Sequence, residues 1–215
     1  WGNVYLQRPD PQSVWPKLTE WPKPNALYNR SQTGGGSWTR IKPMPANWTI
    51  SYNSLGKELN FIIEPTSFKH TGLFPEQAAN WDYCGHIIDN AKAAGKKDIK
   101  ILNLFAYTGG ATIACAAHGA DETVHVDASK GMIQRAKENV IKSGLQDSYI
   151  RFIAEDCMNF VEREIRRGRK YDGIIMDPPA YGRGPKGELS TEINKNITVI
   201  IDGNELKLER KSDDF

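Results

Sequence analysis

The stretch Ile99-Lys-Ile-Leu-Asn-Leu-Phe-Ala-Tyr-Thr-Gly-Gly110 has the pattern of a strand, a turn and the start of a helix. Residues 99–104 are mostly apolar and predict a buried strand, while residues 110–118 predict a helix that Gly119 ends. Glycines directly before a helix let a ligand approach the backbone beside the unpaired N–H groups of the first helical turn. A tight strand-to-helix turn with no ligand would explain the same two glycines.

Strands and helices alternate on both sides of this stretch. We expect helices over 75–94, from the cap Ser129 to Gly144 and over 158–167, and strands over 123–126, 149–153 and 171–176. Such βαβ alternation with short connections predicts an α/β fold, with a doubly wound, Rossmann-like parallel sheet covered by helices on both faces. Ligands of this architecture bind at the carboxyl ends of the strands.

The first 65 residues differ from the rest in composition. They hold five of the six tryptophans and most of the prolines, and residues 48–52 and 59–63 have strand character. We therefore expect a small β-rich N-terminal domain over 1–65, with a packing or lid role, and a second domain over 66–215.

The overall composition sets wide limits. Lys and Arg number 28 against 26 for Asp and Glu, a formal net charge of +2, so a polyanionic partner is neither required nor excluded. Three cysteines without CxxC spacing disfavour a disulfide framework and indicate a reducing, cytoplasmic setting. The four histidines lack ligand-like spacing, and no apolar run approaches the ~18 residues of a membrane span, so we expect neither a metal site nor a membrane partner.

Acidic residues follow the other predicted strands. Asp127 comes eighteen residues after Gly109, where a carboxylate can accept both hydroxyls of a ribose, and Glu155-Asp156 follows the next strand. Asp177 closes the fourth and precedes two prolines. Each acid alone would usually be a solvated side chain or a helix cap, but their order favours a nucleoside site. The absence of GxGxxG disfavours a nicotinamide dinucleotide.

Together these motifs resemble the class I S-adenosylmethionine-dependent methyltransferases, and most closely the bacterial large-subunit ribosomal RNA methyltransferase group. The resemblance covers roughly residues 66–188. The matching segments are Asn103-Leu-Phe-Ala-Tyr-Thr-Gly-Gly110, Val126-Asp-Ala-Ser129, Ala136-Lys-Glu-Asn139, Asp177-Pro-Pro-Ala-Tyr181 and the upstream Phe68-Lys-His-Thr-Gly-Leu-Phe-Pro-Glu-Gln77.

The resemblance implies S-adenosylmethionine as cofactor, with residues 105–110 along its methionine and ribose, Asp127 on the ribose, Asp156 on the adenine and Asp177 nearest the methyl group. The cofactor-binding residues that it implies are Phe74, Gln77, Phe105, Ala106, Tyr107, Thr108, Gly109, Gly110, Asp127, Ala128, Ser129, Asp156, Cys157 and Asp177. The implied catalytic residues are Asp177, Pro178, Pro179 and Tyr181, with the Pro178 carbonyl as a second acceptor and the Tyr181 ring stacked on a base.

The acceptor is less closely determined. Carbon-5 methylation of cytosine generally requires a cysteine nucleophile, and none neighbours the Asp-Pro-Pro motif, which favours nitrogen. An RNA base is the expected substrate, with Arg183 and Lys186 as substrate-binding residues. The basic run over 163–170 has two interpretations, phosphate contacts or a solvated helix C-terminus. A protein or small-molecule acceptor, or a non-catalytic RNA-binding module, are the alternatives.

The C-terminal part departs from the family pattern. Four strands precede Glu188 where the family has seven, and residues 197–208 predict a hairpin around Asp202-Gly203. We expect chain to be missing between Glu188 and Leu189, and the start without Met suggests a longer protein. The sequence leaves the oligomeric state open.

Overall fold

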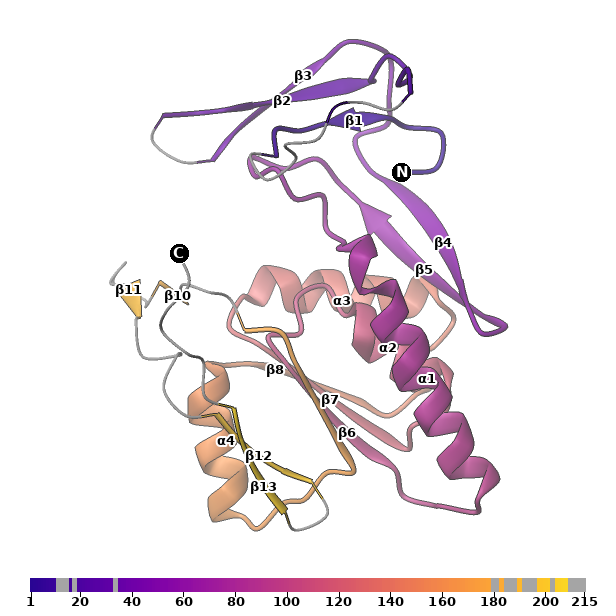
Figure 1. Cartoon of the computed structure of the whole chain (residues 1–215), viewed down its shortest axis with the longest axis vertical. Helices are drawn as coiled ribbons and strands as arrows, with labels where there is room; N and C mark the ends of the chain where they lie inside the picture. The colour runs from indigo at the N-terminus through magenta and orange to yellow at the C-terminus, as the bar shows by residue number, and fades with distance from the viewer. Residues whose placement is uncertain are drawn as a thin grey trace.

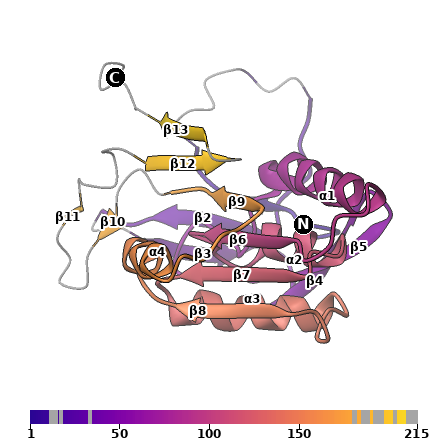
Figure 2. The ribbon, with the colours of Figure 1, turned by 90° about the horizontal axis from the view of Figure 1, so that it is seen from below.

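A parallel four-stranded sheet forms the centre of the molecule (Figures 1 and 2). The structure is a computed structural model that describes residues 1–10, 16, 19–32 and 35–178, and, as backbone alone, 182–183, 189–190, 197–201 and 204–208. The strand order is β8-β7-β6-β9, and every neighbouring pair is parallel. The strands are β6 (Lys100–Leu104), β7 (Glu122–Asp127), β8 (Ile150–Ala154) and β9 (Gly173–Met176). All four predicted strands are confirmed to within two residues at each end.

Helices cover both faces of this sheet, as the βαβ pattern predicted. They are the 3-10 turn η1 (Pro75–Gln77), α1 (Ala78–Ala93), α2 (Gly110–Ala117), α3 (Lys130–Lys142) and α4 (Cys157–Arg166). Side chains of α1, α2 and α3 pack in the clusters on one face, while α4 packs on the other. The predicted first helix is thus split, with Pro75 opening the 3-10 turn.

β6 is apolar on both of its sides because helices cover both faces of the sheet. Leu102 and Leu104 lie in the cluster that contains Phe160 of α4. Ile101, on the opposite side of the strand, lies with Ile88 of α1 and the Cys115 side chain of α2. Both sides of β6 therefore meet helices, which is the expected arrangement for a parallel sheet buried on both faces.

Two β units precede the central sheet. β1 (Leu6–Gln7), β2 (Ala26–Arg30) and β3 (Gly36–Arg40) form one small sheet, and β4 (Trp48–Ser54) and β5 (Lys57–Ile63) form a hairpin, which confirms the two strands predicted there. Leu55 and Gly56 join β4 to β5 with positive φ at both positions, the geometry that suits a two-residue hairpin loop.

The β4–β5 hairpin shares its core with the helices that follow it. Leu59, Phe61 and Ile63 of β5 are fully buried and pack in one cluster with Trp81 of α1 and Val140 of α3. Figure 1 shows the hairpin running from the small sheet toward α1. The division at residue 65 stays a prediction.

The C-terminal part contains two short antiparallel pairs. β10 (Gly182–Arg183) pairs with β11 (Leu189–Ser190), and β12 (Ile197–Ile201) pairs with β13 (Asn204–Leu208), which is the predicted hairpin. Among the helices that the structure describes, none combines the length and apolar character that a bilayer crossing needs.

Candidate functional site

The strand order reverses between β6 and β9, and the candidate site lies at the carboxyl ends of these two strands. From β6 the chain moves outward to β7 and β8 and then returns to the other side of β6 as β9. Leu104 is in register with Met176, so the turn that begins at Phe105 lies beside Asp177. Open α/β sheets bind their ligands at such a switch point.

The turn after β6 has an unusual backbone. Phe105 and Tyr107 adopt left-handed φ angles of 54° and 50°, and Gly109, the N-cap of α2, has a φ of 90°. A Cβ on Gly110 would lie 2.7 Å from the Trp81 ring. Gly109 therefore satisfies a backbone requirement, and Gly110 a packing requirement against Trp81, at the start of α2.

Asp127, at the end of β7, holds this turn. One of its carboxylate oxygens, Oδ2, accepts the Tyr107 N–H at 2.9 Å, and Oδ1 accepts the Ser129 N–H at 2.8 Å. The side chain is half-buried, and each carboxylate oxygen can accept more than one hydrogen bond. The neighbouring Ala128 is exposed, and Ser129 caps α3 by accepting the Met132 N–H, as predicted.

Asp156, at the end of β8, is exposed and caps α4. Its Oδ1 accepts the N–H groups of Met158 and Asn159 at 3.0 and 3.1 Å. Glu155 instead forms an ion pair with Arg163 at 2.6 Å. Of the two acids that follow this strand, Asp156 is therefore the one whose carboxylate faces solvent at the edge of the site.

The segment before α1 reaches both sides of the site. The Thr108 hydroxyl donates to the Gly72 carbonyl at 2.6 Å, and the Phe74 ring lies 5.2 Å from the Tyr107 ring. Gln77 Nε2 donates to Asp177 Oδ2 at 3.2 Å. The structure thus brings Phe74 and Gln77 to the glycine turn and to Asp177, which the sequence spacing alone could not establish.

The last predicted residues are described only in part. Asp177 is exposed and Pro178 half-buried. Arg183 lies in β10, of which only the backbone is described, and Pro179, Tyr181 and Lys186 lie outside the described residues. Their catalytic and substrate-binding roles stay predictions.

Two of the three thiols are buried and protonated at neutral pH. Burial raises the pKa of Cys157 to about 11; its sulfur accepts the Phe105 N–H at 3.3 Å, so the side chain faces the core behind the turn. A hydrogen bond with Cys84 and burial raise the pKa of Cys115. Ala106, between the two left-handed residues, is also buried, and its N–H donates to the Val126 carbonyl at 3.0 Å.

Several buried polar residues beneath the turn escaped the sequence analysis as site residues. Asn139 of α3 donates to the Thr108 carbonyl at 3.0 Å and accepts the Ile62 N–H at 2.9 Å, which links the turn to β5. His125 and Thr112 are fully buried in the same region. For His125 the signal in the sequence is a polar residue within an otherwise apolar strand, and for Asn139 it is its place in the matching segment Ala136-Lys-Glu-Asn139.

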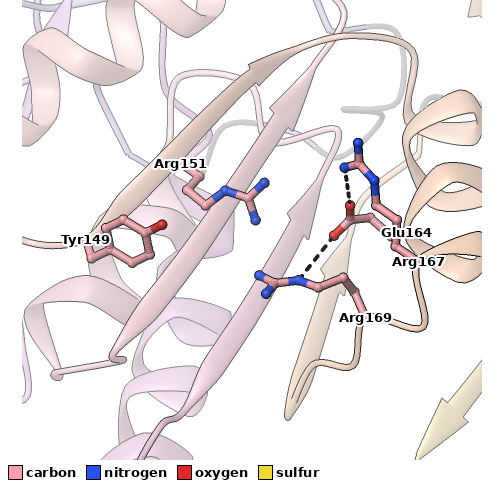
Figure 3. Close-up of a pocket in the computed structure, with 5 residues that line it drawn as sticks. All are labelled: Tyr149, Arg151, Glu164, Arg167 and Arg169. Atoms are coloured by element: carbon pink, nitrogen blue, oxygen red, sulfur yellow. Dashed lines mark hydrogen bonds and ion pairs between the residues drawn. The ribbon is translucent and has the colours of Figure 1, made fainter.

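An arginine-rich pocket lies at the opposite edge of the sheet, where β8 begins and α4 ends. It is lined by Tyr149, Arg151, Glu164, Arg167 and Arg169 (Figure 3). Arg167 and Arg169 lie 3.3 and 3.6 Å from Glu164. Because these arginines pair with buried carboxylates of the same chain, the basic run here serves the fold at least in part. Within the described residues, no three His, Cys, Asp or Glu side chains are grouped as a metal site.

Known proteins resemble this chain in sequence and in structure. A family model described as S-adenosylmethionine-dependent methyltransferase matches residues 30–197. The ribosomal RNA large subunit methyltransferase K/L of Shewanella frigidimarina is 32% identical over 143 residues, which cover 66% of this chain and 19% of that protein. The ribosomal RNA large subunit methyltransferase K of Neisseria meningitidis serogroup B is 29% identical over 143 residues, 66% of this chain and 38% of its own length.

A solved structure extends the likeness to the fold. The crystal structure of an S-adenosylmethionine-dependent methyltransferase from Agrobacterium tumefaciens superposes with a TM-score of 0.78 at 38% identity, covering 87% of this chain and 58% of that one. The chain spans about a fifth of the K/L relative and more than half of the crystallised one.

Proposed function

This chain belongs to the S-adenosylmethionine-dependent methyltransferase family, and on that premise we propose that it methylates a base of ribosomal RNA. The observation that carries the proposal is the position of Asp177. It follows β9 beside the glycine turn, and Gln77 donates a hydrogen bond to it from the segment that covers that turn. The Asp177 carboxylate, a hydrogen-bond acceptor, therefore lies next to the part of the site assigned to the cofactor's methyl group.

The residues at the strand ends fit the cofactor. The left-handed backbone at Phe105, Tyr107 and Gly109 shapes the turn before α2, and Asp127 is oriented by two backbone N–H groups. We assign the ribose hydroxyls to Asp127 and the adenine amine to Asp156, whose second oxygen, Oδ2, takes no part in capping α4. Cys157, whose thiol faces the core, would contribute to the site through its backbone.

The chemistry asked of the protein is mainly orientation. When bound, the cofactor would supply an electrophilic methyl group on a positively charged sulfur and would leave as the neutral thioether S-adenosylhomocysteine, while the methylated amine would release one proton. Asp177 accepts a hydrogen bond from the attacking amine and so aims its lone pair, and the Pro178 carbonyl supplies a second acceptor. The two prolines fix φ and hold this rim in place.

The burial and protonation of the thiols favour nitrogen over carbon 5 of a pyrimidine as the atom that receives the methyl group. A carbon acceptor needs a thiolate, and the pKa of Cys157 at about 11 keeps that sulfur protonated. Cys115 is fully buried. Neither of these two thiols is therefore available to a base, and the third, the half-buried Cys84 of α1, packs against the core cluster that contains Ile88 and Cys115.

Ribosomal RNA as the substrate, and with it a cytoplasmic location, is supported by the names of the two bacterial relatives. The three free cysteines agree with a reducing compartment. Contacts with RNA phosphates would make activity fall steeply as salt rises, whereas a small-molecule acceptor would give little salt dependence.

The test is methyl transfer from radiolabelled S-adenosylmethionine to unmodified large-subunit RNA, with S-adenosylhomocysteine binding measured by calorimetry on the same preparations. For Asp177→Ala we expect transfer to fall about 100-fold or more, as for loss of a group that orients the acceptor. The affinity for S-adenosylhomocysteine, which lacks the methyl group, should stay within about 3-fold, because Asp127 and Asp156 hold the nucleoside.

Asp147→Asn, a change at an exposed loop residue far from the site in sequence, is the matched control and should leave both quantities unchanged. Failure of the unaltered protein to bind S-adenosylhomocysteine would count against the proposed activity. A methyl-transfer activity of Asp177→Ala within about 3-fold of that of the unaltered protein would show that Asp177 takes no part in the chemistry.

A further inference from the structure

Two side chains of the small N-terminal sheet hold neighbouring carbonyls of the segment that follows β5. The Tyr28 hydroxyl, from β2, donates to the Ser67 carbonyl at 3.1 Å, and Trp38 Nε1, from β3, donates to the Phe68 carbonyl at 3.3 Å. Figure 1 shows the chain rising to the small sheet after β5 and then returning to α1. The small sheet therefore fixes the course of the backbone at residues 67–68.

The same segment continues into the candidate site. Four residues after Phe68, the Gly72 carbonyl accepts the Thr108 hydroxyl at 2.6 Å, and the Phe74 ring lies 5.2 Å from the Tyr107 ring. An extended chain spans at most about 3.5 Å per residue, so the backbone of Phe68 lies within about 14 Å of Gly72. A molecule that contacts Phe68 is thus close to the turn assigned to the cofactor.

Phe68 presents an aromatic ring at a position whose backbone is held. Its side chain is 63% exposed, although its own carbonyl and that of Ser67 both accept hydrogen bonds from the small sheet. Trp38, beside it, is half-buried, and its ring packs 5.2 Å from that of Tyr28. An exposed ring on a restrained backbone can stack on a flat partner with little loss of conformational entropy.

Two arginines lie on the same face of β2 and β3 as these rings. Tyr28 is in register with Trp38, and Arg30 and Arg40 each follow by two residues on their own strands, which places all four side chains on one face. The strands are antiparallel, so the two arginines are about 13 Å apart along the strands. Both are exposed, and neither forms an ion pair with the described part of the chain.

The charge around this face is unbalanced. The whole chain carries 28 basic against 26 acidic residues, but residues 21–42 contain Lys23, Arg30, Arg40 and Lys42 and no Asp or Glu. Positive charge interleaved with exposed aromatic rings is typical of surfaces that bind single-stranded nucleic acid. A duplex offers no free base face on which Phe68 could stack.

We propose that this surface, formed by Arg30, Trp38, Arg40 and Phe68 and called here the β2–β3 surface, binds single-stranded RNA next to the base that is methylated. Phe68 stacks on a base of the strand, and Arg30 and Arg40 contact its phosphates. The inference rests on the proposed function, because it places the strand beside the acceptor that Asp177 orients. It gives the small sheet a role in holding the substrate.

The test is direct binding of RNA to the full chain. The probe is a fluorescein-labelled, unstructured RNA of about 12 nucleotides, which is within the size range of single-strand sites. Fluorescence anisotropy gives its affinity at salt concentrations from about 50 to 200 mM.

Arg30→Gln combined with Arg40→Gln tests the phosphate contacts. We expect the slope of log affinity against log salt to shrink by about 1.4, because each phosphate neutralised on a single strand contributes about 0.7. Lys57→Gln combined with Lys97→Gln removes the same charge from exposed positions outside the β2–β3 surface. This control should leave the slope unchanged.

Phe68→Ala tests the stacking. We expect RNA affinity to fall about 10-fold with an unchanged salt slope, as for loss of one stacked base. Phe68→Trp keeps an aromatic face and should bind within about 3-fold of the parent. Tyr83→Ala removes a side chain of α1 that is 66% exposed and is the matched control, which should change nothing.

Measurements without RNA separate this surface from the fold and from the cofactor site. Urea unfolding of each variant should match the parent, and calorimetry should give S-adenosylhomocysteine affinities within about 3-fold of it. A parent protein that binds no S-adenosylhomocysteine contradicts the proposed function, while the RNA titrations still test the β2–β3 surface.

Three results would overturn the inference. The first is a parent that binds S-adenosylhomocysteine but not the RNA, and the second is an unchanged RNA affinity in Phe68→Ala or an unchanged salt slope in the double arginine variant. The third is a loss of specificity for the single strand, seen as equal affinity for a fully paired duplex or as displacement of the RNA by polyglutamate at the same concentration of charge.

Discussion

At the scale of single residues, Asp127 does more than the sequence indicated. The acid after β7 was expected to hold a ribose, and in the structure it also restrains the backbone of the glycine turn through the Tyr107 N–H and that of α3 through the Ser129 N–H. A ligand that contacts Asp127 therefore meets a carboxylate whose orientation is already determined, which lowers the entropic cost of binding.

Asp127→Asn should weaken S-adenosylhomocysteine binding by about 10- to 100-fold. An amide keeps one acceptor oxygen and turns its N–H₂ toward a backbone N–H, so one of two charge-assisted hydrogen bonds, each of about 1.5–3 kcal/mol, is lost along with a ribose acceptor. Calorimetry gives the affinity, and Asp98→Asn, an exposed acid in a loop, is the control. Equal affinities for the parent and Asp127→Asn would show that neither role matters for binding.

At the scale of elements, the β4–β5 hairpin is fastened to α1 and α2 by a cluster of polar side chains in which Ser54 and His118 are buried. The Ser54 hydroxyl donates to Asp82 at 2.7 Å and lies 3.3 Å from His118 Nε2, while His118 Nδ1 lies 2.8 Å from Asp89. The distances between Ser54, His118 and Asp89 resemble those between the nucleophile, base and acid of a catalytic triad. Ser54, however, is fully buried and gives its proton to Asp82, so the cluster serves to hold the elements together.

Ser54→Ala should lower the free energy of unfolding by about 1–3 kcal/mol, because it leaves Asp82 and His118 each short of a buried partner. Urea unfolding followed by circular dichroism measures the change. Ser51→Ala removes an exposed hydroxyl from the same strand and should cost no more than about 0.5 kcal/mol. A similar small loss for both variants would contradict the fastening role.

The sequence predicted elements better than it predicted the contacts between them. The four parallel strands and their helices follow from apolar periodicity and from caps such as Ser129, both of which are local properties. The strand-end acids follow from the same strand boundaries. The contacts of Gln77 with Asp177 and of Asn139 with Thr108 join residues 100 and 31 positions apart, and no local pattern encodes them.

At the scale of the whole molecule, ion pairs at the edge opposite the candidate site join α4 to the sheet. Glu122 of β7 accepts from Arg151 of β8 at 3.0 Å and from Arg169, in the loop before β9, at 2.8 Å. Glu164 of α4 accepts from Arg167 and from the Tyr171 hydroxyl, and it also lies 3.6 Å from Arg169, which thus links α4 to Glu122 of β7. Both carboxylates are buried, so either one left without its partners would be costly.

This cluster predicts a stability that falls in acid. Burial alone would raise the pKa of Glu164, but hydrogen bonds from Tyr171 and Arg167 and the charges of Arg151 and Arg169 lower it below the usual value. A carboxyl whose folded-state pKa is depressed stabilises the fold fully above its unfolded pKa of about 4.3, and that contribution is lost as pH falls toward the folded value. Urea unfolding between pH 3 and 8 should therefore give a flat contribution from Glu164 above about pH 5 and a decline below it.

Glu164→Gln should lower stability at pH 7 by about 2 kcal/mol and make the acid decline shallower, because the variant has no proton to take up there. Glu162→Gln, an exposed neighbour on the same helix, should leave both the stability and its pH profile unchanged. A Glu164→Gln profile parallel to that of the parent from pH 3 to 8 would mean that the acid sensitivity arises elsewhere.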